Sequence, residues 1–86
     1  MYIVAKYHSF DRDMPMWVFE TFEAATQFIK QEVEHELEIQ AKQGNETAYG
    51  YDEDWSWAQI SWHTAEFFDF IEWNIGNIVK EKINYE

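Results

Sequence analysis

The stretch TFEAATQFIKQEVEHELEIQAKQ, residues 21–43, decides the fold because its periodicity is the clearest in the chain. Its apolar side chains recur at every fourth position, with two phenylalanines beside them: Ala25, Ile29, Val33, Leu37, Ala41, Phe22 and Phe28. This is the period of an amphipathic helix with one buried face. Thr21 is a suitable N-cap, and Gly44 is a suitable stop after the basic Lys42. The stretch predicts a helix whose apolar stripe covers one face of the rest of the domain.

The remaining faces of this predicted helix are acidic. Glutamates at alternate positions form two columns, Glu32 with Glu36 and Glu34 with Glu38, and no basic residue follows until Lys42. Residues four apart on a helix rise about 6 Å, while duplex DNA carries one charge per about 1.7 Å of its axis. Such columns are common on solvated helix faces, and they also provide carboxylates at a density approaching that of phosphates.

Length and composition set the limits of the fold. The chain has 86 residues, of which 47% are hydrophobic and 20% aromatic, which predicts a single domain, residues 1–86, with a small core of large side chains. The absence of cysteine excludes disulfides and thiolate metal sites. The sequence has no run of about 18 apolar residues and no basic start followed by an apolar core. We therefore expect an intracellular protein with no membrane span.

The charge of the chain is strongly negative and unevenly distributed. Seventeen acidic and six basic residues give a formal net charge of −11, and the sequence between Gln31 and Trp73 holds eleven acids and one lysine. Such a field repels nucleic acid and anionic membranes and attracts a basic surface on another protein. Acidity also keeps an aromatic-rich protein soluble, so a purely solubilising role explains the charge equally well.

The N-terminal segment predicts a β-hairpin. Residues 2–8, YIVAKYH, are rich in β-branched and aromatic types, and residues 16–20 form a second such run. Asp, Ser and Pro in residues 9–15 favour a turn between them. The stretch 44–54, GNETAYGYDED, has the composition of an exposed connection.

The C-terminal half predicts one further strand and a second helix. Residues 55–62, WSWAQISW, favour a strand by their alternation, although Ser56 and Gln59 also fit a helical capping box. Residues 65–82 follow the candidate N-cap Thr64, and their apolar positions recur at steps of four: Phe67, Ile71, Ile75 and Val79, continuing to Ile83. The expected fold class is α+β, a three-stranded antiparallel sheet with two amphipathic helices in the order β-β-α-β-α. A helical 55–62 would instead give a hairpin with two or three helices.

No pattern in the sequence carries catalysis or a cofactor. Repeated carboxylates do acid–base chemistry only in a pocket that separates their pKa values, and no nucleophile or glycine-rich phosphate loop accompanies them. His35 lies three residues after Glu32 and could share a metal with His8 or His63, but exposed histidine is the commoner case and no metal motif occurs. We expect no enzyme activity, no cofactor and no metal.

The candidate partner-binding residues combine acids with amphipathic aromatics. Such a mixture is typical of protein recognition surfaces, while a tryptophan platform for nucleic acid is disfavoured because basic residues are lacking. Most of the tryptophans are expected in the core, because so small a domain needs large side chains; Trp55 and Trp57 serve as interface anchors if they point outward. The candidates are Glu32, Glu34, Glu36, Glu38, Tyr49, Tyr51, Asp52, Glu53, Asp54, Trp55 and Trp57, with Glu66, Asp69 and Glu72 on the predicted second helix.

The chain resembles the small acidic inhibitors that phages and other mobile elements carry against CRISPR or restriction nucleases. The resemblance lies in its size, its charge, its lack of cysteine and its mixed α/β pattern, and its acidic segments are EVEHELE and YDEDWSW. The resemblance implies a non-catalytic protein in the bacterial cytoplasm, sometimes a homodimer, that acts as a partial DNA mimic and blocks the basic DNA groove of an effector. The alternative is a small acidic α+β interaction or structural module, a monomer or a homodimer, whose charge serves solubility.

Overall fold

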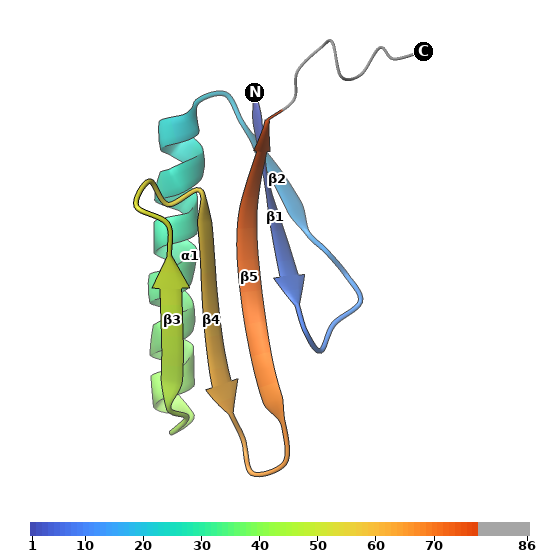
Figure 1. Cartoon of the computed structure of the whole chain (residues 1–86), viewed down its shortest axis with the longest axis vertical. Coiled ribbons are helices and arrows are strands. Elements are labelled where there is room, and N and C mark those ends of the chain that lie inside the picture. Colours follow the sequence, from blue (N-terminus) through green and yellow to red (C-terminus); the bar gives the residue numbers. More distant parts are fainter. Residues whose placement is uncertain (78–86) are drawn as a thin grey trace.

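A computed structural model gives the structure of the chain and describes residues 1–77. Within these residues one helix and five strands follow one another: β1 (Tyr2–His8), β2 (Met16–Phe19), α1 (Phe22–Lys42), β3 (Thr47–Tyr51), β4 (Trp57–His63) and β5 (Phe68–Asn77). The strands form one sheet in the order β2-β1-β5-β4-β3, and every neighbouring pair is antiparallel. The helix α1 lies against one face of this sheet (Figure 1).

The predicted three-stranded sheet with two helices was wrong, because most of the second predicted helix is a strand. Within residues 65–82, β5 occupies Phe68–Asn77 and pairs with β1 and β4, while residues 78–82 lie outside the described part of the chain. A step of four is a multiple of two, so Ile71 and Ile75 share a face on a strand as well as on a helix. Trp73 between them is also buried, which only the period of a strand explains.

Thr64 makes the hydrogen bond expected of an N-cap, but in a turn. Its hydroxyl accepts from the Phe67 N–H at 3.1 Å, as a capping side chain does. However, the Thr64 N–H also donates to the Phe67 carbonyl at 2.8 Å, which closes the β4–β5 hairpin. The same local interaction therefore fits both structures, and the strand pairing decides between them.

The other segments confirm most of the remaining expectations. The first hairpin forms as β1 and β2, and β4 confirms the strand interpretation of residues 55–62. The stretch 44–54 is not entirely a connection, since β3 occupies Thr47–Tyr51. The glycines and the asparagine of residues 44–54 favour a turn. The alternation of Thr47, Tyr49 and Tyr51 is nevertheless a strand pattern.

The helix α1 begins and ends where the sequence predicts. The Thr21 hydroxyl accepts from the Ala24 N–H at 3.0 Å. Gly44, with a φ of +79°, follows the C-cap Gln43 and takes the left-handed conformation that favours glycine. Both ends of the helix therefore find hydrogen-bond partners close in sequence.

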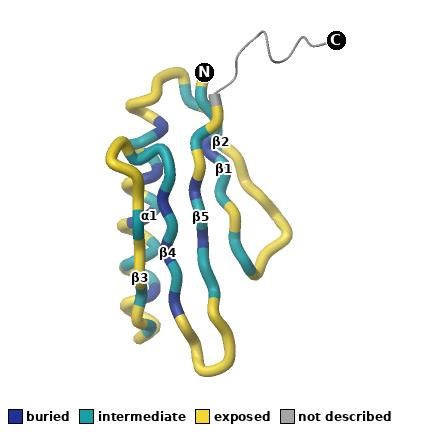
Figure 2. The backbone as a smooth tube through the Cα atoms, in the orientation of Figure 1, coloured by how far each residue is buried: buried dark blue, intermediate teal, exposed yellow. Residues whose placement is uncertain are grey.

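The core lies between α1 and the sheet. The largest fully buried side chains are Val4, Ile29, Ile60, Ile71 and Trp73, and Figure 2 shows buried positions alternating along β4. No element covers the other face of the sheet within residues 1–77. In the same part of the chain, no helix is both long and apolar enough to cross a membrane.

Candidate functional site

A stack of three aromatic rings runs along the outer strand β3. The rings of Tyr49 and Tyr51 lie 6.2 Å apart at an interplanar angle of 13°, and those of Tyr51 and Trp55 lie 4.1 Å apart at 7°. Tyr49 and Tyr51 are 58% and 49% exposed. Alternate residues of a strand share a face, so β3 aligns the two tyrosines, and the following turn adds the indole.

Trp55 completes the stack from an unusual backbone conformation. Its φ is +61°, a region that bulky residues rarely adopt and that costs of the order of 1–3 kcal/mol. Its N–H donates to the Asp52 carbonyl at 2.9 Å, and the Lys30 Nζ lies 5.7 Å from the ring centroid. The turn thus holds the indole between Tyr51 and α1, with a cation already over its face.

Three consecutive acids occupy the turn between the tyrosines and Trp55. Asp52, Glu53 and Asp54 are all exposed. The Ser56 N–H donates to Asp54 at 3.1 Å, and the Ser56 hydroxyl lies 3.4 Å from a carboxylate oxygen of Asp52. Hydrogen bonding to Ser56, through its side chain first and its backbone second, lowers the pKa of Asp54 below its usual value. We call the six residues Tyr49, Tyr51, Asp52, Glu53, Asp54 and Trp55 the β3 edge surface.

The two glutamate columns of α1 do not share one outer surface. Glu32 points toward the sheet, where it pairs with the Lys6 Nζ at 3.1 Å and accepts from the Trp73 Nε1 at 3.3 Å. Glu36 is half-buried and accepts from the Gln40 side chain at 2.9 Å. Only Glu34 and Glu38, of these four, are exposed. The first column therefore lies at the margin of the buried stripe of α1, where its side chains are only partly exposed.

The side chains of the remaining predicted residues are not part of the β3 edge surface, although the Trp57 carbonyl accepts from the Asp52 N–H at 3.0 Å. Trp57 and Glu72 lie on the sheet face turned away from α1, where the indole Nε1 donates to the carboxylate at 2.8 Å. Glu66 is in the β4–β5 turn, and Asp69 pairs with Trp62 near that turn. This turn and the β3–β4 turn lie at opposite ends of β4 (Figure 1). The predicted acids therefore form separate groups and no continuous line of charge.

Sequence reasoning missed Lys30 as a neighbour of this surface. It lies 25 positions before Trp55, and no local spacing connects the two residues. The alignment of Tyr49 with Tyr51, in contrast, is visible in the sequence once residues 47–51 are taken as a strand.

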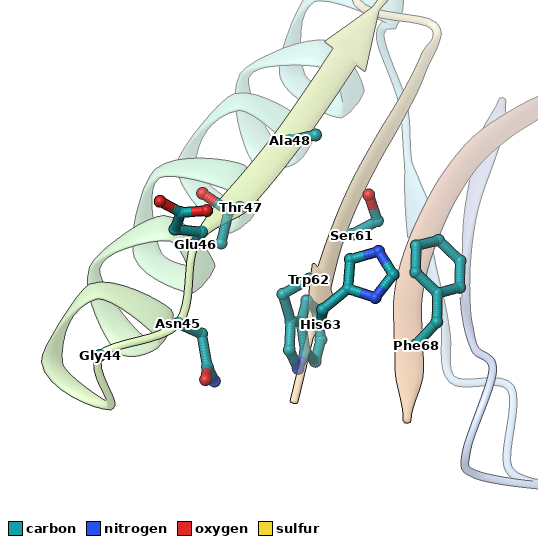
Figure 3. A pocket seen from close by; sticks show the side chains of 9 residues that line it. All are labelled: Gly44, Asn45, Glu46, Thr47, Ala48, Ser61, Trp62, His63 and Phe68. Atoms are coloured by element: carbon teal, nitrogen blue, oxygen red, sulfur yellow. The ribbon is translucent and has the colours of Figure 1, made fainter. Parts of the chain in front are cut away.

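A shallow hollow of about 540 Å³ lies at the other end of β3 (Figure 3). Its His63 and Glu46 do not form a catalytic pair. The His63 ring packs on Phe68, with centroids 4.9 Å apart, while Glu46 lies on the opposite rim. No group of three or more metal-ligating side chains occurs within residues 1–77. The lining residues are Gly44, Asn45, Glu46, Thr47, Ala48, Ser61, Trp62, His63 and Phe68.

Comparisons with protein-family models, curated proteins and solved structures give no match. The chain's own geometry is therefore the evidence for its function. Within the described residues, two features stand out as surfaces for contact with another molecule: the β3 edge surface and the uncovered face of the sheet.

Proposed function

We propose that the chain is a non-catalytic acidic protein that binds a basic, nucleic-acid-binding surface of a partner protein through the β3 edge surface. The observation that carries the proposal is the aromatic stack, with two exposed tyrosines, a partly buried Trp55 in a strained backbone conformation, and three consecutive carboxylates between them. Strained backbone persists where the surrounding structure fixes it, and it clusters at functional sites.

The chemistry of this surface matches arginine and lysine. Carboxylates bind guanidinium groups by paired, charge-assisted hydrogen bonds. Aromatic faces attract the same cations, each contact contributing about 0.5–2 kcal/mol. The contact of Lys30 with Trp55 shows that the stack accommodates a cation from the chain itself. A surface that holds nucleic acid offers many such cations close together.

The remaining acids support binding at longer range. A net charge of −11 attracts a basic partner before contact and accelerates association. Glu34 and Glu38 contribute to this field from the outer side of α1. The three acids of the turn occupy a short stretch of a nucleic-acid groove, so mimicry of DNA is local. The resemblance to phage-encoded inhibitors supports a host defence nuclease as the partner class.

Affinity capture from a bacterial lysate tests this proposal. The first variant, Asp52→Asn, Glu53→Gln and Asp54→Asn together, removes three charges from the β3 edge surface with little change in shape. The matched control, Asp13→Asn, Glu20→Gln and Glu66→Gln together, removes three charges from exposed positions elsewhere. Captures are made at about 0.05 M and about 0.5 M salt, since the higher salt screens exposed charges, with and without duplex DNA.

We expect the wild type and the control to retain a nucleic-acid-binding protein at low salt, and we expect duplex DNA or high salt to release it. The edge variant should retain much less of that protein. Equal capture by the edge variant, or capture that duplex DNA does not displace, would contradict the proposal.

A further inference from the structure

The sheet face turned away from α1 carries an apolar surface. Partners in an antiparallel ladder share a face, so the register identifies the residues opposite the core side of each strand. These open-face residues are Ile3, Ala5 and Tyr7 on β1; Met16 and Val18 on β2; Ala48 and Gly50 on β3; Trp57, Gln59, Ser61 and His63 on β4; and Phe68, Phe70, Glu72, Asn74 and Gly76 on β5. We call this set the open face.

Large apolar side chains on the open face form two exposed groups, one on β1 and β2 and one around Tyr7, Phe70 and Phe68. Met16, Val18 and Phe68 are 60%, 57% and 54% exposed. Val18 pairs with Ile3 across β1 and β2, and the rings of Tyr7 and Phe70 lie 5.8 Å apart across β1 and β5. Polar side chains of β4 and β5 lie on the same face, between these apolar groups and β3. Exposed apolar patches of sufficient size mark interaction surfaces.

The charge distribution indicates what covers this patch. Glu72 is the one acid at an open-face position, and its carboxylate already accepts from the Trp57 indole at 2.8 Å and the Asn74 amide at 3.0 Å. The other acids of residues 1–77 lie on α1, in turns or at strand positions facing the helix. A basic partner finds little to bind on the open face. Two copies of a chain with a net charge of −11 repel each other least where they meet through it.

The area of the open face is sufficient for a dimer. Five strands spaced about 4.8 Å apart, with about seven residues each at roughly 3.4 Å per residue, cover about 600 Å² in projection. Side chains make the accessible area larger than this projection. Stable interfaces bury about 800 Å² per partner, so the open face as a whole matches the size of a specific interface.

We propose that two copies of this chain associate through their open faces in a two-fold dimer. The two sheets then form the centre, and the two helices lie outside. The two β3 edge surfaces remain exposed, because their aromatic rings lie on the helix side of the sheet. A dimer would thus present two copies of the acidic and aromatic surface to one partner.

Sedimentation equilibrium of the full chain at several concentrations and salt levels tests the dimer. The wild type should show twice the chain mass, and its dissociation constant should fall as salt rises, since salt screens the repulsion between the two chains. Binding of the acidic β3 edge surface to a basic partner should instead weaken as salt rises. The two proposals therefore fail independently.

Variants locate the interface. Val18→Glu should weaken self-association by about tenfold or more, because it buries a charge without a partner. Ala24→Glu adds the same charge at an exposed position of α1 and should have a much smaller effect. Met16→Lys is a second test of the same patch with the opposite charge, and circular dichroism checks that each variant remains folded. A wild type that stays monomeric, or a dimer that the patch variants leave intact, would overturn the proposal.

Discussion

Replacing Ile71 and Phe67 separately by alanine tests the strand assignment of β5. Ile71 is 1% exposed and packs in the core, whereas Phe67 is 65% exposed in the β4–β5 turn. Truncating a buried isoleucine costs about 2–5 kcal/mol, while a surface change costs about 0.5 kcal/mol or less. Ile71→Ala should therefore remove a large part of the roughly 4–13 kcal/mol expected for a domain of this length. Phe67→Ala should change the free energy of unfolding very little.

Urea unfolding followed by tryptophan fluorescence measures both effects. With a slope of about 1–3 kcal/mol per molar urea, a loss of about 3 kcal/mol lowers the midpoint by roughly 1–3 M. If residues 65–82 formed one amphipathic helix, Phe67 and Ile71 would belong to the same buried stripe. Similar large losses in both variants would therefore refute the strand.

Three further changes test individual contacts. Glu32→Ala should lower the free energy of unfolding by about 1–3 kcal/mol in urea titrations, because it leaves the Lys6 amine and the Trp73 indole without their shared acceptor. Burial, and then Lys6, lowers the pKa of His8 from 6.5, so the unfolded chain binds more protons and stability should fall as the pH drops below about 6.5. His8→Asn should reduce that fall in stability measurements from pH 7 to pH 5; an unchanged pH profile would contradict the assignment. Gly44→Ala should lower the melting temperature, since its φ of +79° costs a side chain about 1 kcal/mol.

The helix could be predicted from sequence because several independent signals coincide there. The Thr21 cap, the stripe through Ala25, Ile29 and Val33 and the final Gly44 all indicate the same element. β5 could not be predicted in the same way. Its apolar residues fit a step of four and a step of two, and the distinction depends on pairing with β1, which is more than sixty residues away in the chain.

The candidate site was predictable where local sequence determines it. Tyr49, Tyr51 and the acids 52–54 are neighbours in the chain, and the structure keeps them together. The placement of Glu32 against Lys6, and of Trp57 against Glu72, depends on which face each element turns to the core. That choice follows from the sheet order and is not visible in either segment alone.

The most direct test of the central claim is an NMR titration of the chain with a short arginine-rich peptide. If the β3 edge surface binds basic segments, the backbone amides of residues 49–55 and the Trp55 indole N–H should shift first and together. These shifts should disappear at about 0.5 M salt, where exposed charges are screened. Shifts spread evenly over all acidic residues, or centred on Glu34 and Glu38 with Trp55 unchanged, would contradict the account.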